Sequence, residues 1–280
     1  MSSHYGRIYF ISLSISSATI KPIQSFLYEF LIFGLKQARA CVFAGSFFIL
    51  LFASHYITLG LPRYDFIFLG AIVIQLILVL TKLETVDEAK VILLFHLVGF
   101  CLEVFKTNPA IGSWSYPEFG YFKILNVPLY SGFMYAAVGS YIAQAWKIFR
   151  LQLRNMPPYW QAVGLCALIY INFFTHHFIY DVRYMLMAVT VLVFRHTVVE
   201  YTPYKKIRSM SLVASFVLIA FFIWIAENMA TLLGAWKYQD QLITWTTVSL
   251  HKIESWSLLV IISFIIVAYL KHVKASNRGK

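Results

Sequence analysis

The sequence predicts an all-α polytopic integral membrane bundle of about eight transmembrane helices, arranged as two parallel four-helix repeats. Three observations predict it. Hydrophobic residues make up 60% of the 280 positions, charged residues make up only 12%, and the mean hydropathy is +0.72; an ordinary soluble domain has roughly 25% charged residues. Apolar runs long enough for membrane helices recur along the chain. One polar motif occurs twice, each time at the end of such a run.

The apolar runs give the helices in chain order. A short apolar stretch at 26–35 contains Glu29 and is followed by Lys36 and Arg39, which is typical of an interfacial or re-entrant helix. Because a span needs about 20 mostly apolar residues, we predict spans at 41–60, 64–81, 90–106, 127–146, 159–177, 180–195, 209–232 and 254–271. The predicted domains are an N-terminal cytoplasmic or interfacial segment at 1–40, a first repeat at 41–150, a second repeat at 151–272 and a basic C-terminal tail at 273–280.

Basic residues orient these spans, because cytoplasmic loops of membrane proteins hold most of the Lys and Arg. With both termini in the cytoplasm, most of the 23 basic residues lie in inner segments, and the outer segments hold only Arg63, Lys106, Lys123, Arg183, Lys237 and Lys252. The sequence therefore predicts a multi-pass protein of the cell membrane. Its basic residues are scattered through short loops, so the predicted partner is the lipid bilayer and not a nucleic acid.

The repeated motif lies at the predicted outer ends of the third and seventh spans. Its first copy is Glu103, Thr107, Gly112, Trp114 and Tyr116, and its second copy is Glu227, Thr231, Gly234, Trp236 and Tyr238. The Glu–Thr spacing and the Gly-x-Trp-x-Tyr spacing are identical in the two copies. Since glycine permits a sharp turn, we predict a shaped loop that folds over the helix ends. A belt of interfacial aromatic residues is the alternative explanation for Trp and Tyr at this depth.

Glu103 and Glu227 are the candidate catalytic acid and base. Each follows a long apolar run, where an ionisable residue costs roughly 2.5–3.5 kcal/mol on insertion scales and normally faces the bundle interior. Hydrogen bonding of these carboxyl groups to Thr107, Thr231 or Asn228 is the structural alternative. We predict a substrate pocket around the two carboxyl groups, formed by His96, Thr107, Trp114, Tyr116, Asn172, Asp181, Asn228, Thr231, Trp236 and Tyr238.

The pair His176–His177 forms a second polar cluster, and we predict that one of the two assists the carboxyl groups. Adjacent helical residues point about 100° apart, so the pair cannot face one ligand together, and no metal site is predicted. The cysteines Cys41, Cys101 and Cys166 lie in or beside apolar runs without C-x-x-C spacing, which excludes a thiolate metal site. The chain has no nucleotide-binding loop, haem motif or flavin fingerprint, so no cofactor is expected.

Two glycines and two tyrosines of the fourth predicted span are assigned to packing. Gly132 and Gly139 suit a close contact with a neighbouring helix, because small residues let helix backbones approach. Tyr135 and Tyr141 are assigned to the same packed helix surface.

Four stretches carry a resemblance to a known family: Gly-Ser-Trp-Ser-Tyr-Pro-Glu at 112–118, Val-Pro-Leu-Tyr-Ser-Gly-Phe-Met-Tyr-Ala-Ala-Val-Gly-Ser-Tyr at 127–141, Asn-Phe-Phe-Thr-His-His-Phe at 172–178 and Phe-Ile-Trp-Ile-Ala-Glu-Asn at 222–228. The chain resembles the YoaT-like bacterial membrane proteins, domain of unknown function 817, over roughly residues 26–272. This resemblance implies a multi-pass protein of the bacterial inner membrane. It does not indicate which activity the protein has.

A remoter similarity rests on the two motif copies alone. A Glu that ends a helix, followed by Gly-x-Trp-x-Tyr and used twice, is similar to the integral-membrane lycopene cyclases and carotenoid hydratases. That resemblance implies that a membrane carboxylic acid protonates an isoprenoid double bond.

These observations favour a membrane enzyme that acts on an apolar lipid or isoprenoid by acid–base chemistry. Two other interpretations stay open. A transporter or lipid-binding protein would use the same interface between parallel repeats, and a purely structural membrane protein would need neither carboxyl group for activity.

Overall fold

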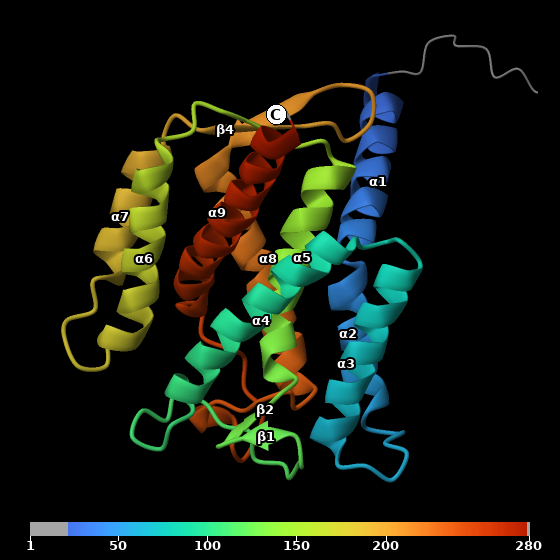
Figure 1. Ribbon diagram of the computed structural model, residues 1–280, viewed down its shortest axis with the longest axis vertical. Coiled ribbons are helices and arrows are strands. Elements are labelled where there is room, and N and C mark those ends of the chain that lie inside the picture. Colours follow the sequence, from blue (N-terminus) through green and yellow to red (C-terminus); the bar gives the residue numbers. More distant parts are fainter. Residues whose placement is uncertain (1–21, 279–280) are drawn as a thin grey trace, which may run out of the picture.

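The computed structural model describes residues 22–278, and helices dominate this part of the chain (Figure 1). The helices are α1 (Pro22–Ala40), α2 (Val42–Ala53), α3 (Arg63–Leu80), α4 (Val86–Lys106), α5 (Ser131–Ile148), α6 (Tyr159–Thr175), α7 (Arg183–Phe194), α8 (Leu212–Leu232) and α9 (Lys252–Arg278), with a short 3₁₀ helix η1 (Gln239–Gln241). Each predicted apolar segment overlaps one of these helices. The prediction of a helical fold is therefore confirmed.

Successive helices run between two ends of the bundle (Figure 1). One end carries β1 (Lys123–Ile124) paired with β2 (Val127–Pro128), together with the loops that follow α4 and α8; we call it the motif end. The opposite end carries an antiparallel sheet of β3 (Gln152–Arg154), β4 (Val198–Tyr201) and β5 (Arg208–Ser211), and we call it the sheet end. The sequence did not predict these strands.

Within residues 22–278, three helices are long and apolar enough to cross a membrane, namely α3, α8 and the Lys252–Tyr269 part of α9. The pair α1–α2 adds a fourth if it is one broken span, because the two helices meet at a bend of 65° near Cys41. The stretch predicted as an interfacial or re-entrant helix lies within α1. Helices α6 and α7 are apolar but shorter. This composition is compatible with a membrane location, and the count of eight spans stays a prediction.

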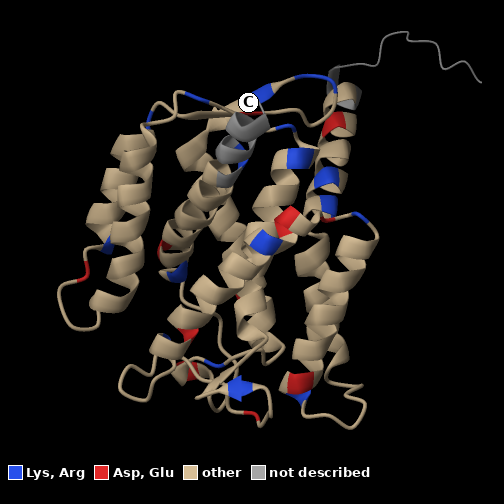
Figure 2. Cartoon of the chain, in the orientation of Figure 1, with Lys and Arg blue, Asp and Glu red and all other residues tan. Residues whose placement is uncertain are grey.

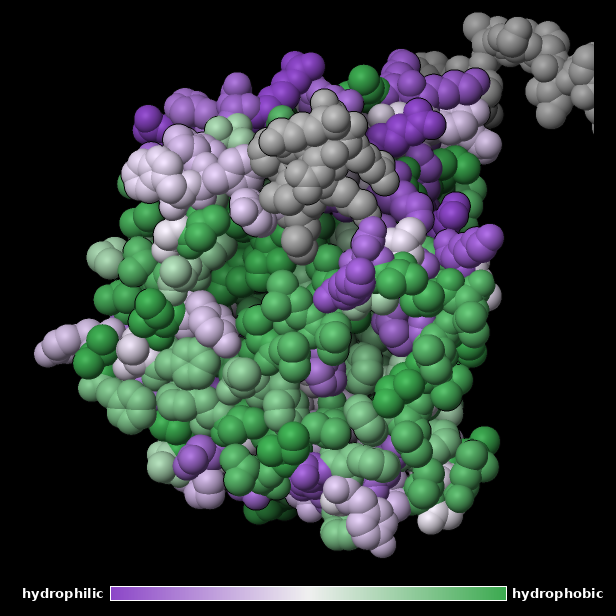
Figure 3. All heavy atoms as spheres, viewed as in Figure 1, coloured by the Kyte–Doolittle hydropathy of each residue, from purple (hydrophilic) through white to green (hydrophobic). Residues whose placement is uncertain are grey.

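Charged and apolar residues are segregated along the bundle. Figure 2 shows Lys, Arg, Asp and Glu mainly toward the two ends, and Figure 3 shows a broad hydrophobic band across the middle of the face in view. Helix α9 continues through 273–278, so this part of the predicted basic tail is helical. Residues 1–21 and 279–280 lie outside the described residues, and the predicted cytoplasmic position of both termini falls on them.

Close packing joins α4 to α5. A Cβ atom on Gly132 would lie 2.6 Å from the ring of His96, and one on Gly139 would lie 2.2 Å from the ring of Phe95. These positions therefore need glycine for the helices to approach, as the sequence predicted. Helix α9 packs against α5, α6 and α8, and its buried residues Leu258 and Val260 belong to the larger hydrophobic core.

Candidate functional site

The two copies of the motif lie side by side at the motif end. The Ser115 N–H donates to the Lys237 carbonyl oxygen at 2.9 Å, and the Lys237 N–H donates back to Ser115 at 3.0 Å. Ser115 and Lys237 stand at the same place in their copies, between Trp and Tyr. Gly112 and Gly234 both have positive φ, 58° and 65°, a conformation that favours glycine. The predicted shaped loop is therefore present in both copies, and the two loops bond to each other.

Glu103 is buried at the centre of the first copy, with 2% of its surface exposed. Its Oε2 accepts hydrogen bonds from Trp114 Nε1 and from the Tyr116 hydroxyl, both at 2.7 Å. Its Oε1 accepts from the Tyr135 hydroxyl on α5, also at 2.7 Å. A carboxylate has about four acceptor positions, so these three donors occupy most of them.

Glu227 has the matching place in the second copy and is 3% exposed. Its Oε1 accepts from the Tyr238 hydroxyl at 2.5 Å, and its Oε2 accepts from Trp256 Nε1 on α9 at 2.8 Å. The Trp236 indole makes no hydrogen bond to Glu227. About half of the acceptor positions on Glu227 are therefore free for a further donor.

The contacts from Thr107, Thr231 and Asn228 to the carboxyl groups, considered as the structural alternative, are absent among the described residues, and these side chains bond to the backbone. The Thr107 hydroxyl donates to the carbonyl oxygen of Glu103 at 2.9 Å, and the Thr231 hydroxyl donates to that of Asn228 at 3.2 Å. Asn228 accepts from the Val248 N–H at 2.9 Å and so ties the loop after η1 to α8. These residues hold the helix ends and loops around the carboxyl groups.

Two donors to the carboxyl groups were missed by the sequence analysis, which assigned Tyr135 to packing and Trp256 to the belt of interfacial aromatic residues. Each lies on the helix that follows its motif copy, α5 or α9, and each donates to the carboxyl group of that copy. The sequence contained one sign of this role: near its start, each of these helices has an aromatic residue with an O–H or N–H group that can donate a hydrogen bond.

The two histidines lie with Lys106 at the motif end. The Nε2 atoms of His176 and His177 are 3.2 Å and 2.7 Å from Lys106 Nζ, and no hydrogen bond joins either ring to Glu103 or Glu227 among the described residues. The three side chains therefore form one polar cluster that is separate from both carboxyl groups.

The other predicted pocket residues are dispersed. The Asn172 side chain donates to Asp181 Oδ1 at 3.2 Å, which fixes the turn between α6 and α7. The His96 ring packs on Phe133 with centroids 4.7 Å apart, and its Nδ1 has no hydrogen-bond partner. Among residues 22–278, no three His, Cys, Asp or Glu side chains are arranged to hold a metal ion.

A cavity of about 510 Å³ opens between α2, α5 and α8, within the usual range for ligand pockets. Its walls are almost entirely apolar, and they extend along α8 from Leu212 to Ala230, roughly 27 Å at 1.5 Å per residue. The Glu227 side chain lines the cavity near the motif end, beside Trp236 and Trp256. Glu103 does not line it.

Fold and site together define a mostly helical protein, compatible with a membrane location, that buries two carboxyl groups at one end of the bundle and exposes one of them to an elongated apolar cavity. The chain belongs to the family described as Protein of unknown function (DUF817), whose model matches residues 29–264. It is 51% identical over 249 residues to the "Uncharacterized protein YoaT" of Bacillus subtilis (strain 168), an alignment that covers 89% of this chain and 94% of the relative. No solved structure matches the chain.

Proposed function

We propose that the protein spans the bacterial cell membrane eight times as two parallel four-helix repeats, α2–α5 and α6–α9. The packing of the helices supports this. The contacts α2–α3, α4–α5 and α2–α5 of the first half have counterparts in α6–α7, α8–α9 and α6–α9 of the second. The matching helices α5 and α9 touch each other, and the matching residues Ser115 and Lys237 pair. An axis that relates the halves would pass between these elements.

We further propose that the protein is a membrane enzyme that binds an apolar lipid or isoprenoid in the 510 Å³ cavity. The observation that carries this proposal is the single carboxyl group on a mostly apolar wall, whose other polar residues, such as Gln37 and Ser215, carry no charge. Burying an apolar chain there removes hydrocarbon surface from polar surroundings. Glu227, with acceptor positions left free by Tyr238 and Trp256, meets the reactive or polar part of the ligand.

Acid–base chemistry follows from that placement. No basic side chain forms an ion pair with Glu227 in the described part of the chain, and an unpaired buried charge costs several kcal/mol. Protonated Glu227 would transfer its proton to a carbon of an isoprenoid double bond. The resulting carboxylate would take a proton from the neighbouring carbon, so the acid is restored and the double bond has moved. The resemblance of the motif copies to lycopene cyclases favours this class of reaction.

A carrier of apolar molecules is the second candidate, and the broken helix favours it. The bend between α1 and α2 lies at Cys41, which lines the cavity together with Gln37. Discontinuous helices beside a binding site are a recurring feature of transporters.

Filling the cavity tests the proposed site. Ala226 lines the cavity one residue before Glu227, and Ala214 lies exposed on the same helix outside it. We expect Ala226→Phe to abolish binding of geranylgeraniol or palmitoleyl alcohol, measured by native mass spectrometry from detergent micelles, and Ala214→Phe to leave it unchanged. Equal binding by both variants would refute the site. The two alcohols have main chains of equal length, so a preference between them separates isoprenoid from straight-chain ligands.

Turnover separates the enzyme from the carrier. Cells expressing the intact protein, Glu227→Gln or an empty vector are compared by untargeted mass spectrometry of extracted lipids. An enzyme gives a mass or isomer change with the intact protein only, because Gln cannot supply the proton. Three identical lipid profiles at equal expression would reject the enzyme and leave the carrier.

A further inference from the structure

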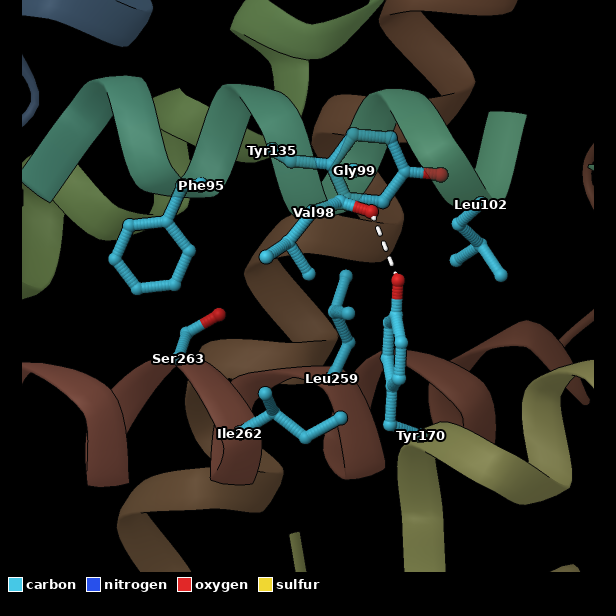
Figure 4. A pocket seen from close by; sticks show the side chains of 9 residues that line it. All are labelled: Phe95, Val98, Gly99, Leu102, Tyr135, Tyr170, Leu259, Ile262 and Ser263. Atoms are coloured by element: carbon cyan, nitrogen blue, oxygen red, sulfur yellow. Dashed lines mark hydrogen bonds between the residues drawn. The ribbon is translucent and has the colours of Figure 1, made fainter. Parts of the chain in front are cut away.

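A small pocket beside the helix that carries Glu103 matches the large cavity position by position. This pocket, of about 10 Å³, lies between α4, α5, α6 and α9 (Figure 4). On α4 it is lined by the residues one, four, five and eight positions before Glu103; on α8 the residues at the same four distances before Glu227 line the large cavity. The residues that line the two spaces therefore occupy equivalent positions on α4 and α8.

The second wall also corresponds. Leu259, Ile262 and Ser263 on α9 line the small pocket, while α5 presents Val138, Tyr141 and Ile142, at the same spacing, to the large cavity. Tyr135, the α5 donor to Glu103, lines the small pocket, as Trp256, the α9 donor to Glu227, lines the large one. Each space is thus lined by the aromatic donor from the next helix, whereas of the two carboxyl groups Glu227 lines the large cavity and Glu103 does not line the small pocket.

The small pocket and the large cavity differ in how far side chains fill them. Beside α4, Tyr170 of α6 reaches across the pocket, and its hydroxyl donates to the Val98 carbonyl oxygen on α4 at 3.2 Å (Figure 4). Gly99 admits the Tyr135 ring, because a Cβ atom there would lie 2.3 Å from it. In the second half, Ile223 stands at the place of Gly99, and the exposed side chains of Leu218 and Phe222 border an open cavity.

We infer that the pocket beside α4 is a closed copy of the apolar binding site, shut by the Tyr170 side chain, and that the described part of the chain has one open site, at Glu227. The class of ligand, a single apolar chain, rests on the proposed function. Glu103 is in this arrangement a structural carboxylate: its three donors come from the loop and from α5, and together they join the first motif copy to the bundle.

Removing the Tyr170 ring tests the inference. We expect Tyr170→Ala to open the first site, so that the number of palmitoyl-length alcohols bound per chain rises from one to two in native mass spectrometry with palmitoleyl alcohol as the probe. Tyr170→Phe keeps the ring and loses only the hydroxyl, and it should still bind one. The double variant Tyr170→Ala with Ala226→Phe should bind one, at the first site alone.

The outcomes separate this inference from the proposed function. Binding of one molecule by a folded Tyr170→Ala variant would overturn the inference and leave the site at Glu227 standing. Binding of none by the intact protein and one by Tyr170→Ala would overturn the proposed function and the open site at Glu227, and would leave only the closed site standing. If Tyr170→Ala does not fold, Glu103→Gln decides: it should still bind one molecule and have a lower Tm, whereas loss of binding at an unchanged Tm would overturn the structural role of Glu103.

Discussion

Glu103 and Glu227 occupy equivalent places, yet the side chains around them give them different chemistry. Glu103 accepts three hydrogen bonds and lies away from the large cavity, whereas Glu227 accepts two and borders it. The repeated motif predicted that Tyr116 and Tyr238 lie in a pocket around the two carboxyl groups. It could not predict Tyr135 and Trp256, because contacts between helices depend on how the helices pack and leave no local spacing in the sequence.

The two motif glycines should be hard to replace. Alanine in the left-handed region costs roughly 1–2 kcal/mol, and both Gly112 and Gly234 have positive φ. We expect Gly112→Ala and Gly234→Ala each to lower the free energy of unfolding by about that amount, measured by chemical denaturation in micelles. Gly164 on α6 has ordinary φ and open space around its Cβ position, so Gly164→Ala is the control and should not destabilise. Equal stability of all three variants would contradict the turn assignment.

At the scale of elements, apolar periodicity located the helices well and their ends less well. A span was predicted at 41–60, but helix α2 ends at Ala53 and a loop follows. The stretch at 26–35 is part of the longer helix α1. Hydrophobicity indicates burial in an apolar medium and not helical structure. A span predicted from it therefore continues through apolar loop residues such as Tyr56 and Ile57. The short strands of the sheet end went unpredicted because two to four residues carry too little pattern.

The pairing of the two loops should contribute to stability. Ser115→Pro removes the N–H that bonds to the Lys237 carbonyl oxygen, and the loss of one such hydrogen bond costs about 0.5–1.5 kcal/mol. We expect the variant to lose stability of that order, as a lower denaturation midpoint in micelles. Ser115→Ala keeps the backbone N–H and serves as the control, with a midpoint close to that of the intact protein. A Ser115→Pro variant as stable as Ser115→Ala would show that the pairing carries no energy.

At the scale of the whole molecule, the sequence predicted the order in which helices cross the bundle but not the space left between them. The large cavity exists because α8 and α2 stay apart where α4 and α6 touch. That difference arises from side chains such as Tyr170 that join helices far apart in sequence, and hydropathy does not record it. The asymmetry between the halves is therefore a property of the packed bundle.

The distribution of basic residues makes a prediction for the assembled molecule in its membrane. Tyr56 follows α2 and Asp240 lies in η1, at the motif end, whereas Lys82 follows α3 and Lys205 lies between β4 and β5, toward the opposite end; all four are exposed. Single cysteines at these positions, in a chain with Cys41, Cys101 and Cys166 replaced by alanine, should divide into two classes. We expect a membrane-impermeant maleimide to label positions 56 and 240 in intact cells, and positions 82 and 205 only after permeabilisation, because the sheet end holds most of the Lys and Arg. Labelling of position 82 together with 56 from outside would show that α3 does not cross, and reversal of both classes would place the motif end in the cytoplasm.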